Sequence, residues 1–159
     1  MAEFSFREAQ REDCEKILFF IRQLSIYEKM ENLVYATVEG LENWLFDKSA
    51  ARVIFAMCDG KEVGFALYFY NFSTFMGSCG LYLEDLFILP EYRNRGIGKA
   101  MMQKLAAIAV EEGLTRFEWC CLDWNAPSIA FYKSLGAVAM DEWTTYRLQG
   151  ESLQALAKK

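Results

Sequence analysis

The stretch RNRGIGKA, residues 93–100, decides how the rest of this chain is interpreted. It places two arginines directly before a turn that carries Gly96 and Gly98, in a protein that is acidic overall. Glycines where a turn becomes a helix let backbone N–H groups approach an anion closely, and the positive end of the helix dipole favours negative charge. Charge-assisted contacts are available from three basic side chains, Arg93, Arg95 and Lys99. The stretch therefore predicts a phosphate site, and a plain turn with a solvated basic cluster is the alternative.

Two familiar nucleotide loops do not fit this stretch. A P-loop needs a glycine where the chain has Arg93, and a serine or threonine where it has Ala100. A dinucleotide-binding fingerprint needs a glycine where Met101 stands. The predicted phosphate must therefore belong to another kind of ligand.

The sequence before this loop predicts a strand-rich region. RVIFAMC and EVGFALYFY flank Asp59-Gly60, the turn dipeptide of a tight antiparallel hairpin. GLYLEDLFIL reads as a further strand that Pro90 closes. Nearer the start, Phe4 and Phe6 alternate with polar residues in an opening strand.

Helices are expected on both sides of these strands. Apolar residues at helical spacing predict an amphipathic helix over residues 13–27, and Thr37 is a suitable cap for a second, short helix. A long helix follows the glycine turn and stops at Gly113.

The last third of the chain continues this alternation. RFEWCCL predicts a strand, residues 125–135 a short helix, and residues 144–148 a final strand before a polar tail. Antiparallel strands followed by strand–helix–strand–helix–strand predict a mixed-sheet α/β fold. With 53% hydrophobic and 16% aromatic residues, we expect one folded domain over residues 1–159.

Charge and composition exclude several classes of function. The net charge is −5 and the pI about 4.9, which argues against general nucleic-acid binding. The chain has no histidine, so we expect no metal site and no Ser-His or Cys-His nucleophile pair. Any general acid or base must be a carboxylate, tyrosine, cysteine, lysine or ordered water.

The cysteines and the chain's start predict a cytoplasmic protein. Five cysteines, odd in number and without a C-x-x-C pair, are expected as reduced thiols, listed as Cys14, Cys58, Cys79, Cys120 and Cys121. The first residues, MAEFSFREAQ, lack the pattern of a signal peptide, and no apolar run is long enough to cross a membrane.

Residues 93–98 resemble the Q/R-x-x-G-x-G/A pyrophosphate loop of the GCN5-related N-acetyltransferases. A second signature of that family also fits, because Asn125 opens a short helix and Tyr132 follows seven residues later on the same face. Longer stretches are similar to the spermidine/spermine (diamine) and thialysine acetyltransferase group, namely YEKME at 27–31, LYLEDLF at 81–87 and WNAPSIAFYK at 124–133. The similarity extends over residues 4–148.

This resemblance implies a mostly antiparallel central sheet flanked by helices, with a V-shaped cleft for acetyl-CoA. It implies that the acetyl and pantetheine portions lie along Leu86, Phe87 and Ile88. The remaining residues implied to hold acetyl-CoA are Arg93, Asn94, Arg95, Gly96, Ile97, Gly98 and Lys99 in the loop, and Asn125, Ala126, Pro127, Ser128 and Tyr132 in the short helix.

The resemblance also implies a small cationic amine as substrate and a homodimer as the assembly. Contacts with the amine are expected from Tyr27, Glu28, Glu84, Asp85, Glu118, Trp119 and Cys120. Glu28 at the end of a helix is poorly placed against the helix dipole, which supports a role in binding a cation.

Two residues are the expected catalytic groups, Glu84 and Tyr132. Glu84-Asp85 interrupts an apolar strand, and in a regular strand only one of the two would line the cleft, unless a bulge intervenes. Glu84 is expected to hold the ammonium and pass its proton to water, because a carboxylate in direct contact would oppose deprotonation. Tyr132 is expected to protonate the leaving thiolate, and backbone N–H groups near residues 86–88 to hold the oxyanion.

The sequence leaves several alternatives open. Spermidine, a shorter diamine, thialysine and an antibiotic amine all fit as substrates. A protein or peptide amine is a less favoured acceptor, because the compact chain has no added peptide-binding insertion. A non-catalytic acyl-CoA sensor would keep residues 93–99 but would not need Tyr132 or Glu84. The role of Asp85 is also undecided.

Overall fold

A computed structural model describes residues 4–158 of the chain. Its residues form two compact units, one up to Cys120 and one from Cys121 onward, and each is described by itself. The expectation of a single domain over the whole chain remains a prediction.

The first unit is built on a five-stranded sheet in the order β1-β2-β3-β4-β5. The strands are β1 (Phe4–Glu8), β2 (Arg52–Cys58), β3 (Lys61–Ser73), β4 (Ser78–Ile88) and β5 (Phe117–Trp119). All neighbours pair antiparallel except β4 and β5, which are parallel. Asp59 (φ 50°) and Gly60 (φ 73°) both adopt the left-handed conformation that a two-residue hairpin turn requires. The predicted mixed-sheet α/β fold is confirmed.

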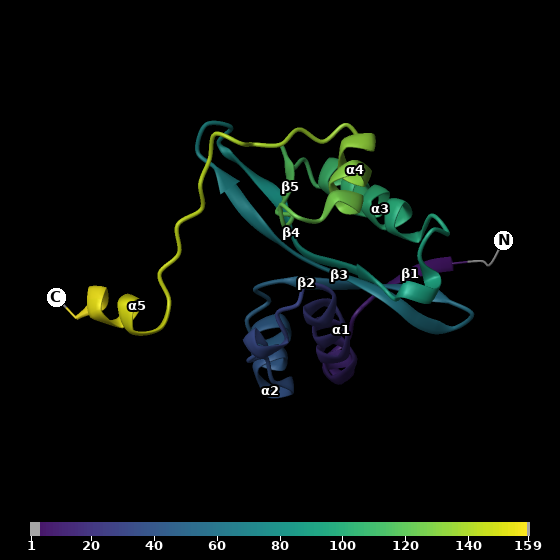
Figure 1. Cartoon of the computed structure of the whole chain (residues 1–159), viewed down its shortest axis with the longest axis horizontal. Coiled ribbons are helices and arrows are strands. Elements are labelled where there is room, and N and C mark those ends of the chain that lie inside the picture. The colour runs from purple at the N-terminus through teal and green to yellow at the C-terminus, as the bar shows by residue number, and fades with distance from the viewer. Residues whose placement is uncertain (1–3, 159) are drawn as a thin grey trace. The chain divides into compact units, whose positions relative to one another are not determined.

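Helices cover both faces of this sheet (Figure 1), with α1 and α2 on one side and α3 on the other. The helices are α1 (Cys14–Tyr27), α2 (Val38–Leu41), which continues as the π-helix Glu42–Asp47, and α3 (Ile97–Glu111). Short 3₁₀ turns lie at Arg11–Asp13, Glu31–Leu33 and Pro90–Tyr92. The Thr37 hydroxyl accepts a hydrogen bond from the Gly40 N–H at 3.0 Å, which confirms the predicted cap.

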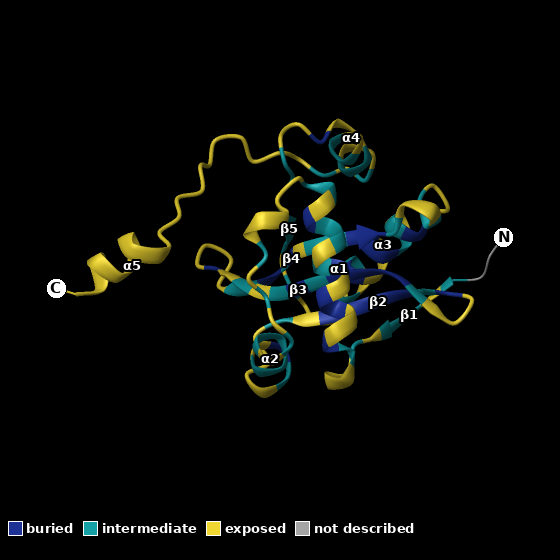
Figure 2. Ribbon diagram, turned by 60° about the horizontal axis from the view of Figure 1, so that its bottom comes forward, coloured by how far each residue is buried: buried dark blue, intermediate teal, exposed yellow. Residues whose placement is uncertain are grey.

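The main core lies between α1 and the sheet. Ile17 and Phe20 of α1 are buried against Phe55, Phe65 and Phe87, one ring from each of three strands. The Phe20 and Phe65 rings stack with centroids 5.5 Å apart. Figure 2 shows the same arrangement, with buried strands inside and exposed helix faces outside. These contacts fix the position of α1, and with it the position of the residues that follow α1.

An ion-pair network ties the start of α1 to the strands. Arg7 donates hydrogen bonds to Asp13 at 2.7 Å and to Glu62 at 2.5 Å, and Lys16 also contacts Glu62. Burial opposes ionisation of Glu62, but the hydrogen bonds from Arg7 and Lys16 outweigh it and lower its pKa to about 2. These carboxylates are thus compensated by nearby cations.

The second unit holds two helices, α4 (Ala126–Ser134) and α5 (Gly150–Ala157). The buried Asn125 caps α4, since its side chain accepts a hydrogen bond from the Ser128 N–H at 3.3 Å. Pro127 lies in the first turn, and Gly136 (φ 86°) follows the end of the helix. The predicted helix is therefore confirmed.

Two strand predictions need correction. The strand predicted at residues 144–148 is wrong, because that segment is extended but pairs with no other strand and its residues are exposed. Alternating apolar residues do not make a strand unless a neighbour accepts and donates the backbone hydrogen bonds. The strand predicted for RFEWCCL is shorter, and only Phe117–Trp119 pairs with β4. The polar tail that follows residue 148 forms the helix α5.

Over residues 4–158, we find no helix with both the length and the apolar character needed to cross a bilayer.

Candidate functional site

The glycine loop between β4 and α3 has the geometry of an anion site. Asn94 (φ 60°) and Gly96 (φ 81°) are both left-handed, a conformation that asparagine and glycine adopt most readily. Gly96 is the N-cap of α3 and has no side chain to satisfy the first N–H groups of the helix. The N–H groups of the first turn, which begins at Ile97, are therefore available to an anion.

The three basic residues of the loop differ in what they contact. Arg95 and Lys99 are exposed, and the Arg95 guanidinium lies 5.2 Å from the centre of the Tyr92 ring. Arg93 is half-buried, and its Nε–H donates to the Ile88 carbonyl at 2.8 Å. Within residues 4–158, none of the three forms an ion pair with a carboxylate. The charges of Arg95 and Lys99 are thus available for an external anion, whereas Arg93 is engaged within the protein.

A β-bulge in β4 determines which face of the sheet the adjacent carboxylates Glu84 and Asp85 point to. Leu67 pairs with Asp85 and Tyr68 pairs with Leu83, so Glu84 has no partner on β3. Leu83 and Leu86 pair with Tyr68 and Ala66, which share one face because they are two residues apart. The two residues between Leu83 and Leu86 must therefore both point to the opposite face.

That opposite face is the one covered by α1. Asp85 pairs with Leu67, which packs against the α1 core, and Phe87 belongs to that core. Glu28 directly follows α1 and is half-buried. Glu28, Glu84 and Asp85 thus gather on one side of the sheet, where the charges of Glu28 and Glu84 act on Asp85.

These three carboxylates differ from the ion-paired carboxylates elsewhere in the protein, such as Glu62, in having no ion-pair partner within the described part of the chain. Burial, together with the negative charges of Glu84 and Glu28, raises the pKa of Asp85 to about 7. Burial likewise raises the pKa of Glu28. No cation of residues 4–158 forms an ion pair with any of them. The group is therefore suited to accept a positive charge from outside the protein.

The β5 residues divide between the two faces. Tyr82 pairs with Phe69 and with Glu118, so Glu118 and Cys120 lie on the same face as Asp85. Trp119 pairs with Leu83 and points to the other face. Glu118 is already compensated, because its Oε1 lies 2.7 Å from Arg116 Nε and accepts from Asn71 at 3.1 Å.

One edge of β4 is open beyond the bulge. Pairing with β5 stops at Leu83, whereas pairing with β3 continues to Ile88. The Leu89 N–H donates to the Val63 carbonyl at 2.9 Å, so it points towards β3. Along an antiparallel strand the N–H groups point alternately towards and away from the neighbouring strand. The N–H groups of Leu86 and Ile88 therefore point away from β3. Of the three residues predicted to line the thioester, these two have donors directed at the open edge.

The short-helix residues lie in the second unit. Asn125 caps α4, Ala126, Pro127 and Ser128 form its first turn, and Tyr132 is half-buried near its end. The Phe131 and Tyr132 rings contact each other with centroids 5.4 Å apart. Whether Tyr132 acts together with Glu84 remains a prediction.

Tyr82 is a residue of this site that sequence reasoning missed. Its hydroxyl lies 3.0 Å from the Cys120 Sγ, and its pKa is raised by burial, by Cys120 and by the charges of Glu84 and Glu118. Its position two residues before Glu84 was the available signal, because alternate residues of a strand share a face. The bulge alters that alternation only after Tyr82.

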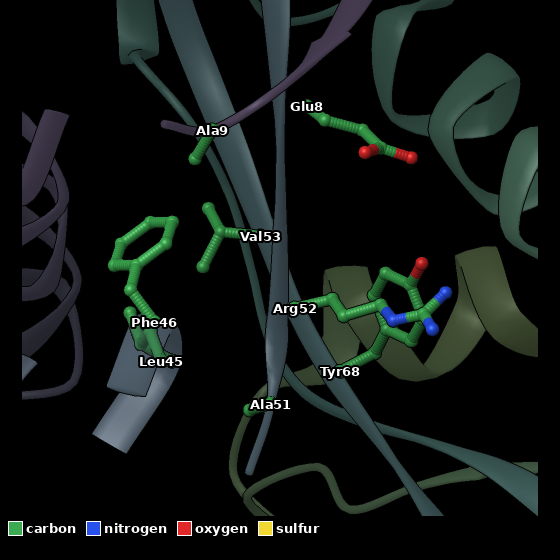
Figure 3. A pocket seen from close by; sticks show the side chains of 8 residues that line it. All are labelled: Glu8, Ala9, Leu45, Phe46, Ala51, Arg52, Val53 and Tyr68. Atoms are coloured by element: carbon green, nitrogen blue, oxygen red, sulfur yellow. The ribbon is translucent and has the colours of Figure 1, made fainter. Parts of the chain in front are cut away.

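A pocket at the far end of β2 contains none of the predicted site residues (Figure 3). In Figure 3, Phe46 and Val53 lie on one side of β2, and Arg52 lies beside Tyr68 on the other. Arg52 is engaged within the protein, 3.6 Å from Glu112 and 5.4 Å from the centre of the Tyr70 ring. We therefore assign this pocket no ligand.

Comparisons with known proteins agree with this geometry. Residues 7–137 match the acetyltransferase (GNAT) family. The chain is 37% identical to the thialysine N-epsilon-acetyltransferase of Sus scrofa over the full length of both chains. It is 32% identical to the human spermidine/spermine N(1)-acetyltransferase-like protein 1, covering 97% of this chain and 24% of that protein. An integron cassette protein from the mobile metagenome of V. cholerae has a similar fold, with a TM-score of 0.83, 30% identity, and 100% and 99% of the two chains covered.

The mixed sheet with a glycine loop before α3 agrees with the fold of the similar structures and with the family match. The chain belongs to the acetyltransferase (GNAT) family. It is an N-acetyltransferase, and its predicted resemblance to the thialysine and spermidine/spermine group is confirmed by these relatives.

The uncompensated charge of Asp85 gives a pH-dependent prediction. Its pKa is about 7 in the folded protein, above the ordinary value of 3.8, so the folded state binds more protons between these two values. Stability should therefore fall as pH rises through that window. We expect Asp85→Asn to raise the free energy of unfolding at pH 8 by an amount on the order of 1–4 kcal/mol.

Urea unfolding at pH 4 and pH 8 measures this effect. The difference between wild type and Asp85→Asn should shrink towards zero at pH 4, and the exposed-site control Glu91→Gln should show no such pH dependence. An Asp85→Asn variant that is equally or less stable at pH 8 would contradict the assignment.

Proposed function

We propose that this enzyme transfers the acetyl group of acetyl-CoA to a primary amine of a lysine-like molecule or a small polyamine. Transfer occurs by direct attack in a ternary complex, without a covalent enzyme intermediate. The observation that carries the choice of acceptor is the gathering of Glu28, Glu84 and Asp85 on one face with no cation of their own. The name of the thialysine acetyltransferase relative supports a lysine-like acceptor.

The acidic face suits an alkylammonium ion. The charges of Glu84 and Glu28 raise the pKa of Asp85, and a cation that enters beside them would offset this repulsion. A molecule with a second amine gains twice, because one charge can remain on Glu28 or Asp85 while the other amine reacts. Glu118 contributes less, since Arg116 already compensates it.

Deprotonation of the reacting amine is the first chemical requirement. An alkylammonium has a pKa of about 10.4, so it arrives charged and must lose a proton before it can attack. Glu84 is the exposed member of the acidic group, and is therefore the one able to pass a proton to water. Asp85, mostly buried, is better suited to binding than to exchanging protons with solvent.

The open edge of β4 supports stabilisation of the reacting carbonyl. The Leu86 and Ile88 N–H groups are donors without a strand partner on that side. When such donors face a carbonyl oxygen, they stabilise the charge that develops on it during attack. Tyr132 is our candidate for protonating the departing sulfur, as in the sequence interpretation.

The glycine loop fits a diphosphate, the group that acetyl-CoA would present to it. Ligands for it would be the N–H groups at the start of α3 together with the Arg95 and Lys99 side chains. Acetyl-CoA supplies the activated acetyl group when bound. Asn125 to Ser128 remain proposed contacts from the second unit.

Two alternatives are tested by the same experiments. A protein or peptide amine as acceptor would leave the small amines unreactive. A non-catalytic acyl-CoA sensor would bind CoA without turnover, and would not need Glu84 or Tyr132.

The role of Tyr132 gives the first prediction of this proposal. Tyr132→Phe removes one hydroxyl, so kcat should fall about 100-fold or more while the Kd for CoA stays within about twofold. An acetyl-transfer assay across amines of graded length, including thialysine, spermidine and short diamines, measures turnover, and calorimetry measures CoA binding. Phe131→Tyr, added to the Tyr132→Phe variant, is not expected to restore turnover, because the new hydroxyl lies on another face of α4.

Loss of CoA binding in Tyr132→Phe would point to a structural role instead. If the wild-type enzyme acetylates no amine of the panel, the small-amine assignment is refuted.

Gly98 separates a diphosphate loop from an ordinary turn. A methyl group built on Gly98 meets no atom within 4 Å, and Gly98 lies in the first turn of α3. Gly98→Ala should therefore leave stability unchanged or raise it by up to about 1 kcal/mol, because alanine favours the helix. Alanine fits the G/A position of the loop pattern, so CoA binding should also survive this change. Gly98→Asp should keep the fold, because an acidic residue suits the first turn of a helix, and should weaken CoA binding at least about tenfold, because its carboxylate repels a diphosphate.

The measurements are thermal unfolding and CoA calorimetry on the same variant. The matched control is Gly113→Asp, just beyond the other end of α3, where φ is +70° and the substitution should cost stability without affecting CoA affinity. CoA affinity that is unchanged in a stable Gly98→Asp protein would exclude the loop as the diphosphate site.

We further propose a cytoplasmic homodimer in which the C-terminal segment contributes to the interface. All five cysteines are thiols and none is in a disulfide, which is typical of a reducing compartment. In the C-terminal segment, Trp143 and Tyr146 are 77% and 92% exposed. Light scattering should show a dimer that Trp143→Ser shifts towards monomer, whereas the exposed neighbour Glu142→Gln should not. A monomeric wild-type protein would contradict this part of the proposal.

A further inference from the structure

The side chain of Arg93 is directed into the protein and not towards the glycine loop's N–H groups. Its guanidinium carbon lies 4.9 Å from the centre of the Tyr27 ring and 5.1 Å from that of Phe87. Its Nε–H donates to the Ile88 carbonyl at 2.8 Å. A planar guanidinium that stacks on two rings and donates from its edge is held in one orientation.

These contacts join three parts of the proposed site. Tyr27 is the last residue of α1 and directly precedes Glu28. Ile88 lies on the open edge of β4. Because the N–H and carbonyl of a strand residue point in the same direction, both of these groups of Ile88 point away from β3. Arg93 itself is at the start of the glycine loop. One side chain thus connects the amine side, the β4 edge and the loop.

Backbone hydrogen bonds and ring packing also hold the end of α1. After Tyr27 the chain turns at Lys29 (φ 60°), and the Met30 N–H returns to the Ser25 carbonyl at 2.8 Å. Glu28 is placed by this turn and by the packing of Tyr27, whose ring also lies 6.5 Å from that of Phe87. Loosening the stack on Tyr27 should therefore release Glu28 first.

We propose that Arg93 is a positioning residue that fixes Glu28 and the end of α1 against β4, and that its side chain acts on amine binding and not on the diphosphate. This inference rests on the proposed function for its effect on the amine. The positioning itself does not depend on that function, because it concerns only contacts within the first unit.

The test compares two arginines of the same loop, Arg93→Lys and Arg95→Lys. Lysine keeps the charge at both positions but lacks the planar guanidinium and its Nε–H. For Arg93→Lys we expect the amine KM to rise about fivefold to thirtyfold, with the Kd for CoA within about twofold of wild type. For Arg95→Lys we expect the reverse, a weaker CoA affinity and an unchanged amine KM.

Hydrogen exchange supplies a readout that needs no turnover. The N–H groups of Glu28, Lys29 and Met30 donate to Leu24, Ile26 and Ser25 at 2.9, 3.1 and 2.8 Å. Exchange at these amides should be about tenfold faster in Arg93→Lys and unchanged in Arg95→Lys, while the amides of α3 exchange alike in both. Tyr27→Leu, which removes one ring of the stack and leaves the loop intact, should accelerate the same amides.

The outcomes separate the two proposals. If Arg93→Lys weakens CoA binding as Arg95→Lys does, or leaves exchange at residues 28–30 unchanged, the positioning role is refuted. If exchange responds as expected but the amine KM does not change, the role in amine binding is refuted. If the wild-type enzyme acetylates no amine while the exchange result holds, the proposed function fails and the positioning role stands.

Discussion

The bulge at Glu84 is the constraint on which the rest of the site depends. One extra residue in β4 removes the strict alternation of the strand, and so two consecutive carboxylates point to the same face. The pairing of β4 with β5 ends at the residue before the bulge, which leaves the Leu86 and Ile88 N–H groups on an open edge. A regular strand in this position would have directed one of the two carboxylates to the face covered by α3. The bulge and the unpaired edge beside it therefore lie at the centre of the proposed site.

The distribution of compensated and uncompensated charge distinguishes structural from functional carboxylates. Glu62 is held by Arg7 and Lys16, and Glu118 by Arg116, so their charges stabilise the fold or are neutral towards it. Asp85 has no such partner and its proton affinity is raised. An enzyme that binds cations has a reason to keep such a group, because the cost of the unpaired charge is recovered when substrate binds. The rigid α1 core makes this possible by keeping Glu28 close in the absence of substrate.

Most of the fold could be predicted because its elements have strong local signals. Asp59-Gly60, the Thr37 cap, the glycine turn before α3 and the Asn125 cap each fix a boundary through short-range chemistry. The failures are strands whose existence depends on a partner. The residues at 144–148 alternate as a strand would, yet nothing in that segment specifies the neighbour that would hydrogen-bond to it. The length of β5 was overestimated for the same reason, since only the three residues opposite β4 are paired.

The sequence by itself determined the family, the glycine turn before α3 and the presence of an acidic dipeptide in an apolar strand, because these depend on residue types at fixed spacing. It could not determine the direction of Asp85 or of the Arg93 side chain. The first is decided by register between β3 and β4, and the second by the meeting of Tyr27, Phe87 and Ile88 from distant parts of the chain. Register and stacking are properties of packed neighbours, so only the tertiary structure fixes which face of the sheet Asp85 points to and which rings the Arg93 guanidinium contacts.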